Sequence, residues 1–185
     1  MTQNSKLEIE IKIKADRIFG LRVGTNNLRT KIAKLSIFFE ITVAHLDLGG
    51  HYFKDEAAEN LAAVLLQCPS LARLYLGRNN IGAEGAGRLA AVLPQCASLS
   101  HLDLTGNRIC DQVACRLAAM LPQCLSLAHL DLGDNYIGAE GAGRLAAVLG
   151  QCPSLAPLHL CCNSIGAEGA GRLAAVLGQC PSLAD

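Results

Sequence analysis

A unit of 28 residues is repeated along most of the chain, and this repeat limits the folds that the chain can adopt. The spacing between successive copies never changes, so chance is not a serious explanation. The copies begin at Val43, Leu71, Leu99, Leu127 and Leu155. A repeat of this length predicts a solenoid, in which each copy forms the same supersecondary unit and stacks on its neighbours.

Each copy divides into a leucine pattern and an amphipathic stretch. The first half reads L-x-x-L-x-L-x-x-N-x-I-G, and its positions 3 to 6 alternate between polar and apolar residues, which predicts a short strand. In the second half, apolar residues recur at helical spacing, as at Ala86, Leu89 and Leu93. Glu84 and Arg88 lie four residues apart on the opposite face and predict an ion pair, as do Glu140 with Arg144 and Glu168 with Arg172. Neither element can bury its apolar face alone, so we expect stacked copies to share one core.

The pattern resembles the leucine-rich repeat family, and specifically the 28-residue ribonuclease-inhibitor-like class found in NOD-like receptors. The resemblance covers residues 43–185. It implies an α/β fold, a right-handed solenoid or horseshoe with a concave parallel sheet and convex helices. This range holds five repeats and a truncated sixth, which begins at Leu183 and stops at Asp185. On that ground we expect a fragment or a truncated gene model.

The asparagine at position 9 carries a structural expectation from the same resemblance. In this family such an asparagine bridges backbone groups in the turn that leaves the strand, because its amide both donates and accepts hydrogen bonds. His51 holds this position in the first copy, which we interpret as an atypical terminal repeat. The asparagines concerned are Asn79, Asn107, Asn135 and Asn163.

Residues 1–42 differ in composition from the repeats and form a separate N-terminal segment. They hold five of the six lysines and seven isoleucines, but only two of the 18 glycines. Residues 7–14 alternate between apolar and charged side chains, which is typical of a strand. The segment is a cap over the first repeat, a remnant of another domain, or a translation of unrelated sequence. Composition leaves these three alternatives open.

The formal net charge of zero is the sum of two unlike parts. Residues 1–42 carry 8 Lys and Arg against 4 Asp and Glu, a net of +4, whereas residues 43–185 carry 8 against 12, a net of −4. An acidic solenoid argues against binding to nucleic acid and favours a basic protein surface as partner. No stretch resembles an apolar signal peptide or a membrane span. We therefore expect a soluble, cytoplasmic protein that binds no membrane.

Neither the cysteines nor the glycines predict a cofactor site. The ligand spacing of a zinc site is missing, so no metal is expected. The run Gly82–Gly87 lacks the Gly-Lys-Ser/Thr ending of a phosphate-binding loop and recurs at the repeat spacing, so it predicts turns and helix packing, not nucleotide binding. We expect an exposed thiol in the adjacent pair Cys161 and Cys162, and small, buried, inert thiols at position 26. Those at position 26 are Cys68, Cys96, Cys124, Cys152 and Cys180.

Polar side chains at positions 3 and 5 of the strands form the candidate site. Position 4 faces the core, so positions 3 and 5 point to the concave face, where neighbouring strands lie about 4.8 Å apart. His101 should therefore lie beside His129, and Asp103 beside Asp131. Such a grid suits a metal ion or a histidine switch that responds to pH, whereas a solvated polar face is the simplest interpretation.

Differences between the copies mark the same face. The last two complete copies share an identical stretch of 20 residues, 137–156 and 165–184, and all their differences fall at positions 3 to 10. A constant scaffold with a variable strand face indicates a recognition surface, although recent duplication with drift gives the same pattern. The candidate partner-binding residues are Arg73, Tyr75, Arg78, His101, Asp103, His129, Asp131, Tyr136 and His159.

These observations predict a non-catalytic protein–protein interaction module that binds its partner through the concave strand face, without a cofactor. The resemblance implies a sensing or regulatory arm, as in NOD-like receptors of innate immunity, or an inhibitor arm, as in ribonuclease inhibitor. One alternative is a GTPase activator resembling the Ran-activating leucine-rich repeat proteins, with Arg78 or Arg108 stabilising phosphoryl-transfer charge. The other is a fragment without a function. No Ser or Cys forms a nucleophile arrangement with the histidines, so we expect no enzyme activity.

Overall fold

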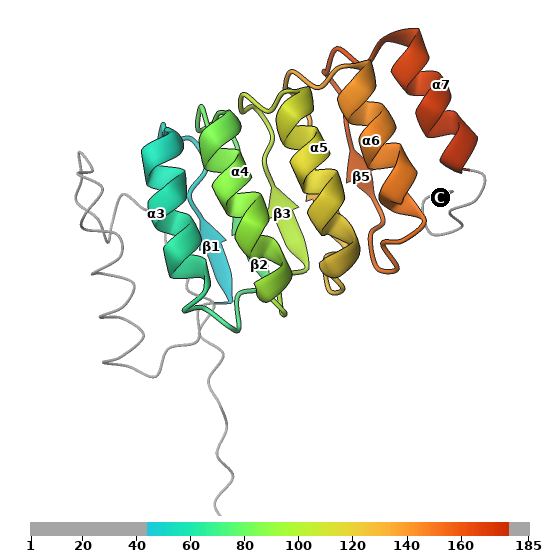
Figure 1. Cartoon of the computed structure of the whole chain (residues 1–185). Helices are drawn as coiled ribbons and strands as arrows, with labels where there is room; N and C mark the ends of the chain where they lie inside the picture. The colour runs from blue at the N-terminus through green and yellow to red at the C-terminus, as the bar shows by residue number, and fades with distance from the viewer. Residues whose placement is uncertain (1–43, 178–185) are drawn as a thin grey trace, which may run out of the picture.

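The computed structural model describes residues 44–177, which form one row of strands and one row of helices (Figure 1). The N-terminal segment 1–42 and the partial sixth copy at 183–185 lie outside the described residues. Five strands make one parallel sheet in the order β1-β2-β3-β4-β5, and a helix follows each strand along the chain. The predicted α/β solenoid with a parallel sheet is confirmed.

The elements recur at the repeat spacing. The strands are β1 (His45–Asp47), β2 (Arg73–Tyr75), β3 (His101–Asp103), β4 (His129–Asp131) and β5 (Leu158–His159). The helices are α3 (Asp55–Leu65), α4 (Ala83–Val92), α5 (Asp111–Met120), α6 (Ala139–Leu149) and α7 (Gly166–Leu177). Two 3₁₀ turns, Leu93–Gln95 and Leu121–Gln123, follow α4 and α5 and contain the prolines that end those helices.

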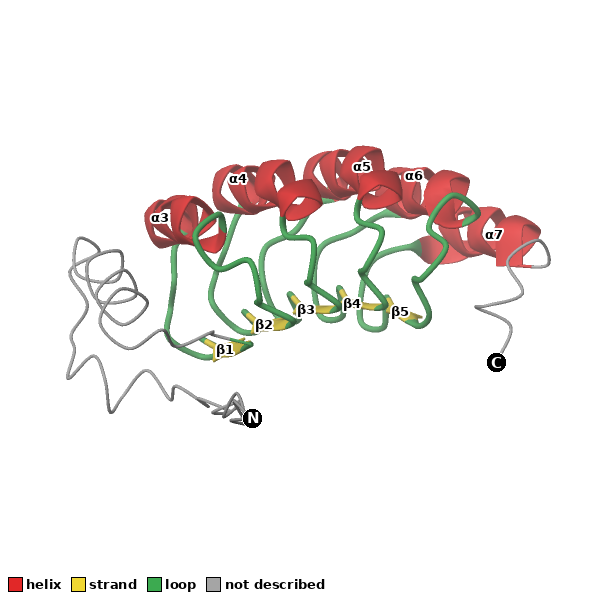
Figure 2. Ribbon diagram, turned by 90° about the horizontal axis from the view of Figure 1, so that it is seen from below, coloured by secondary structure: helices red, strands yellow, loops and turns green. Residues whose placement is uncertain are grey.

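Figure 2 shows the helices on the outer, convex side of a gently curved row, with the strands on the opposite side. Neighbouring strands pair at identical repeat positions, so Leu74 lies beside Leu102, and Leu102 beside Leu130. Side chains at one repeat position therefore form a row across the sheet. The register places the leucine rows inside the solenoid and the polar rows on its concave surface.

Leucine rows fill the space between the sheet and the helices. Leu74, Leu102 and Leu130, at position 4 of their copies, are buried, and so are Ala86 and Leu89 on the inner face of α4. The helix face predicted from the apolar spacing is thus confirmed. Full burial of one leucine side chain contributes about 2 kcal/mol, so these rows are the main source of stability.

A buried asparagine joins each repeat to the one before it. Asn107 Oδ1 accepts hydrogen bonds from the N–H groups of Asn79 at 3.2 Å and Ile81 at 2.9 Å, both in the preceding repeat. Its Nδ2 donates to the carbonyls of Leu76 and Leu104, each at 3.0 Å. One side chain thus bonds the backbones of two repeats. Asn79, Asn135 and Asn163 make the same kind of bridge.

Glycine at position 15 allows neighbouring helices to approach closely. A Cβ atom on Gly141 of α6 would lie 2.9 Å from the Cβ of Ala114 in α5, and one on Gly85 of α4 would lie 2.8 Å from the Cβ of Ala58 in α3. The glycine run thus serves helix packing, as the sequence indicated. In α5 this position is Val113, which is fully buried, and its branched side chain keeps α5 farther from α4.

Two aspartates cap the helix of the following repeat. Asp111, the first residue of α5, accepts hydrogen bonds at Oδ1 from the N–H groups of Gly138 at 2.6 Å and Gly141 at 3.0 Å, at the start of α6. Asp55 caps α4 in the same way. These bonds satisfy N–H groups that a helix start otherwise leaves unpaired. At the same position α4 carries Ala83, which offers no such cap to α5.

Proline shortens the last described strand. In β4, the His129 N–H donates to the carbonyl of Ser100 at 2.9 Å. Pro157 holds the equivalent position in the next repeat and has no N–H to donate. Regular strand pairing therefore begins only at Leu158, and β5 forms the edge of the described sheet.

Replacement of Asn107 by alanine should lower the free energy of unfolding by at least about 3 kcal/mol, because several buried backbone groups lose their partner at once. Chemical denaturation of the whole chain measures this. The matched variant Asn163→Ala should lose less than half as much, because Asn163 is half-buried and water can replace part of its bonds. Equal losses of unfolding free energy would show that the buried bridge of Asn107 contributes no more to stability than the half-buried bridge of Asn163.

Candidate functional site

The candidate partner-binding residues occupy two different regions. Six of them lie on β2, β3 and β4: Arg73, Tyr75, His101, Asp103, His129 and Asp131. Arg73 is exposed and the other five are half-buried. His159 lies exposed on β5, while Arg78 and Tyr136 lie on the loops that leave β2 and β4 and are exposed as well. The strand residues thus form one continuous surface, and the two loop residues lie at its strand-exit edge or beyond.

An aromatic row crosses the middle of the concave face. The rings of His101 and His129 have centroids 4.3 Å apart, and the rings of Tyr75 and His101 have centroids 5.9 Å apart. The strand register places His101 directly beside His129 and Asp103 beside Asp131. These are the neighbours that the repeat spacing predicted.

The environment of His101 favours its neutral form. Burial lowers the pKa of His101 below its usual value of 6.5, and the charges of His129 and Arg73 lower it further, while Asp103 acts in the opposite direction. Within residues 44–177, no group of three or more His, Cys, Asp or Glu side chains is arranged to hold a metal ion. The groups of this face that can contact a ligand are the neighbouring rings of His101 and His129 and the neighbouring carboxylates of Asp103 and Asp131.

The strand aspartates also have a structural role that sequence reasoning missed. Asp103 Oδ1 accepts a hydrogen bond from the Thr105 N–H at 2.8 Å, and Asp131 Oδ1 accepts one from the Gly133 N–H at 2.8 Å. In the first repeat, Asp47 Oδ1 accepts the equivalent hydrogen bond from the Gly49 N–H at 3.1 Å. An aspartate bonding its own backbone two residues on is a known turn signal, and its recurrence at position 5 was visible in the sequence. These carboxylates are consequently held in place, each through its Oδ1 atom.

A hollow of about 510 Å³ opens where the first three strands end. Asp47, Tyr75 and Asp103, which lie side by side on β1, β2 and β3, line it on the strand face. Gly77 and Arg78 line it on the loop side. The repeat pattern predicted three of these residues as binding residues but did not bring them together with Asp47.

Arg78 has a strained backbone. Its φ angle is +57°, in the left-handed region that side chains other than glycine rarely adopt. Gly50 and Gly106 occupy the same position in other copies and also have positive φ angles. Glycine at position 8 in two copies was the sequence signal for this turn. Asp134 and Cys162, at the same position of the fourth and fifth copies, have φ angles of +51° and +54°, so this left-handed turn belongs to the repeat and carries a side chain in three of the five copies.

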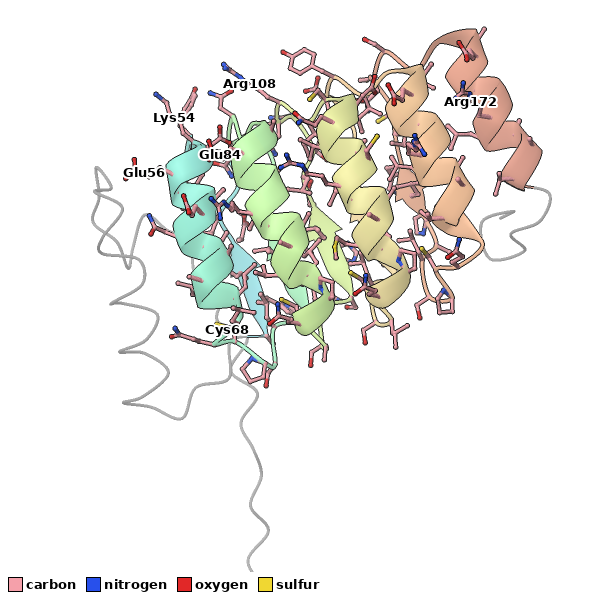
Figure 3. The ribbon with its side chains drawn as sticks, viewed as in Figure 1. Lys54, Glu56, Cys68, Glu84, Arg108 and Arg172 are labelled. Carbon is pink, nitrogen blue, oxygen red and sulfur yellow. The ribbon has the colours of Figure 1, made fainter. Side chains whose placement is uncertain are left out.

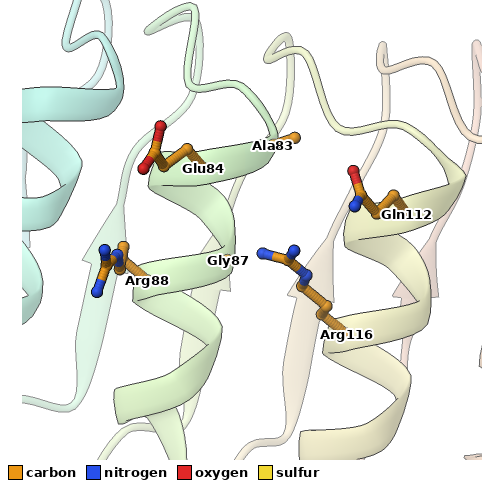
Figure 4. A pocket seen from close by; sticks show the side chains of 6 residues that line it. All are labelled: Ala83, Glu84, Gly87, Arg88, Gln112 and Arg116. Atoms are coloured by element: carbon orange, nitrogen blue, oxygen red, sulfur yellow. The ribbon is translucent and has the colours of Figure 1, made fainter.

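The convex side carries a second hollow, of about 480 Å³, between α4 and α5 (Figure 4). Its position follows from Val113, which separates these two helices. The Arg116 side chain extends toward Gly87 across this space (Figure 4). Arg88 also lines the hollow, and its guanidinium lies 3.8 Å from Glu59 of α3.

The ion pairs predicted on the outer helices are only partly observed. Glu168 and Arg172 form the expected pair at 2.7 Å. The pair predicted between Glu84 and Arg88 is wrong, because Arg88 reaches Glu59 of the neighbouring helix instead. Both partners of that pair are more than half exposed, so its contribution to stability is small.

Most described cysteines are placed as expected. Cys68 lies at the end of α3 opposite Lys54 and Glu56 (Figure 3), and it is buried, as are Cys96 and Cys152. Burial raises the pKa of the half-buried Cys124 to about 11, so this thiol is largely protonated and unreactive at neutral pH. Cys161 and Cys162 are both exposed. Cys180 lies outside the described residues.

The family model described as Leucine Rich repeat matches residues 67–90, 95–112 and 123–146. These segments contain β2, β3 and β4 with most of the helices α4 and α6, so the matched pattern and the observed fold coincide. The chain therefore contains leucine-rich repeats. No curated protein matches it.

Two solved structures resemble this leucine-rich repeat protein. The structure of Leiomodin-1 Actin-Binding Site 2 has a TM-score of 0.67 and 14% sequence identity, over 80% of this chain and 86% of that chain. An internalin from Listeria monocytogenes has a TM-score of 0.37 and 20% identity, over 62% of this chain and 35% of that chain. The likeness to leiomodin shows the solenoid fold. Among residues 44–177, no helix is both long and apolar enough to cross a membrane.

Replacement of Arg78 by glycine should stabilise this leucine-rich repeat protein by about 1 kcal/mol, because the left-handed backbone no longer carries a side chain. Chemical denaturation measures the change. The converse variant is Gly50→Ala, at a position with φ of +73° and open space around it, and it should lose a similar amount. If Arg78→Gly is no more stable than the wild type, the strain assigned to Arg78 is absent.

Stability should fall as the pH drops below about 6.5, the usual pKa of histidine. Between that value and the lowered pKa of His101, the unfolded chain binds more protons than the folded chain, so acid favours unfolding. Thermal unfolding at a series of pH values measures the slope. The variant His101→Gln should show a shallower fall over this window, and an unchanged slope would contradict the assignment.

Proposed function

We propose that this leucine-rich repeat protein is a non-catalytic protein-binding module that contacts its partner through the concave strand face. The observation that carries the proposal is the continuous surface of Arg73, Tyr75, His101 and His129 with the aspartates between them. Tyrosine and arginine are the residues that most often anchor protein interfaces. Their side chains stand on a sheet that the buried leucine and asparagine rows hold in place.

Two further observations support recognition at this face. Differences between the last two complete copies are confined to the strand and its exit loop, while the helix sequence stays constant. At position 8, on the same edge, Arg78, Asp134 and Cys162 keep side chains on a left-handed backbone where glycine would fit without cost. Both features are expected of a surface that has been fitted to a partner on an unchanged scaffold.

The finer part of the proposal follows the resemblance found in the sequence. The chain belongs to the ribonuclease-inhibitor-like class, acts in the cytoplasm, and serves as the sensing or regulatory arm of a NOD-like receptor or a similar protein. The similar leiomodin structure is an actin-binding site of that protein, and the likeness extends to the fold. On the chemistry of the concave face, the partner proposed here is a protein with a basic surface; neither nucleic acid nor a nucleotide is expected to bind.

Affinity capture with matched variants tests the proposal. The whole chain is immobilised, retained proteins are quantified by mass spectrometry, and Tyr75→Ala, Arg73→Ala and His129→Ala are compared with the wild type. Loss of a central aromatic or arginine anchor weakens binding by about tenfold or more. A protein retained by the wild type should therefore be depleted with the concave-face variants.

The control is Arg144→Ala, which removes an exposed arginine from α6 on the convex side. This variant should retain the same proteins as the wild type. If the convex variant loses them and the three concave variants keep them, the binding face is wrong. If none of the four variants changes retention, the concave-face proposal fails.

A further inference from the structure

The hollow at the strand exits combines acidic and aromatic groups in one row. Asp47, Tyr75 and Asp103 lie on adjacent strands in register, so the tyrosine stands between two carboxylates. Gly77 lies in the loop that follows β2, and its lack of a side chain makes room for the Asp103 carboxylate. A Cβ atom there would lie 3.2 Å from Asp103 Oδ2, so this oxygen overlies Gly77 and faces the hollow.

The carboxylates are held in position before any ligand arrives. Asp47 Oδ1 accepts the Gly49 N–H, and Asp103 Oδ1 accepts the Thr105 N–H. These bonds fix the side chains and leave Oδ2 of each as the acceptor for a ligand. A site whose acceptors are already ordered loses little conformational entropy on binding.

Arg78 forms one wall of the hollow. Its Cγ atom lies 3.0 Å from where a Cβ on Gly106 would be, and Asp134 Oδ2 approaches the same point at 3.5 Å. The stem of Arg78 therefore passes over Gly106 of the third repeat. With two carboxylates against one guanidinium, the hollow carries a net charge of −1 and attracts a cation.

We infer that this hollow is a subsite for the guanidinium group of an arginine side chain on the partner protein; this inference rests on the concave-face function proposed above. Two strand spacings, about 10 Å, separate the backbones of Asp47 and Asp103. A planar guanidinium can stack on the Tyr75 ring while its fork of N–H donors reaches a carboxylate at its edge. A compact ammonium group has no flat face to stack and a shorter reach, so lysine fits the same space less well.

The test titrates the whole, isotope-labelled chain with N-acetyl-arginine amide and follows the backbone amide signals by NMR. Signals of Tyr75, Gly77 and Asp103 should shift together, with a dissociation constant in the millimolar range. N-acetyl-citrulline amide has nearly the same shape without the charge and should cause no saturable shift. N-acetyl-lysine amide should bind more weakly than the arginine probe.

Asp103→Asn is the diagnostic variant, because asparagine keeps the Oδ1 acceptor for Thr105 and removes the charge. It should weaken binding of the arginine probe roughly tenfold. The matched control is Glu140→Gln, which likewise replaces one carboxylate by its amide, at an exposed position in the first turn of α6 and outside the hollow. It should leave the affinity within about twofold, as expected for a site that does not touch the probe.

Three results would overturn the subsite. They are shifts that map elsewhere on the surface, equal losses of affinity in Asp103→Asn and Glu140→Gln, and lysine or citrulline probes that bind as tightly as arginine. Such a result leaves the proposed function standing if the captured protein still depends on Tyr75. The converse result is also distinguishable. If the arginine probe binds at this hollow but no captured protein depends on the concave face, the subsite is retained and the proposed function is rejected.

Discussion

The structure depends on the buried asparagine that ties each repeat to its predecessor. Its amide accepts N–H groups from one repeat and donates to carbonyls of two, as Asn107 does between the second and third copies. These backbone groups leave the strands in turns that cannot pair within a regular sheet, and buried polar groups without partners are costly. The bridge satisfies them and fixes the distance between repeats, so each strand meets the next at the same repeat position.

Constant register converts the repeat sequence into surface chemistry. Position 4 becomes a buried leucine row, while positions 3 and 5 become polar rows on the concave face. Tyr75, His101 and His129 form an aromatic row because they belong to adjacent strands, although about 28 residues of chain separate each from the next. The same register holds Asp47 and Asp103 on either side of Tyr75 and so builds the hollow at the strand exits.

Departures from the repeat give the solenoid its individual features. Val113 in place of glycine separates α5 from α4 and opens the convex hollow. Pro157 removes one N–H from the sheet ladder and shortens β5. Arg78, Asp134 and Cys162 carry different side chains at a left-handed turn where the other two copies have glycine. In each case one residue acts on a scaffold that its neighbours keep unchanged, which is how a repeat protein gains distinct surfaces without losing its fold.

The sequence by itself determined the solenoid, the parallel strands, the buried helix face and the neighbouring pairs His101–His129 and Asp103–Asp131. The spacing and the apolar pattern can be read in every copy, and stacking repeats the unit that one copy forms. It did not reveal the turn bonds of the aspartates, the strain at Arg78, the partner of Arg88, or the placement of Asp47 with Tyr75. These depend on backbone angles, on the spacing of helices and on which side chains of different repeats approach each other. Only the tertiary structure decides such contacts, because the repeat spacing sets which strands are neighbours but not the backbone angles or the directions of the side chains.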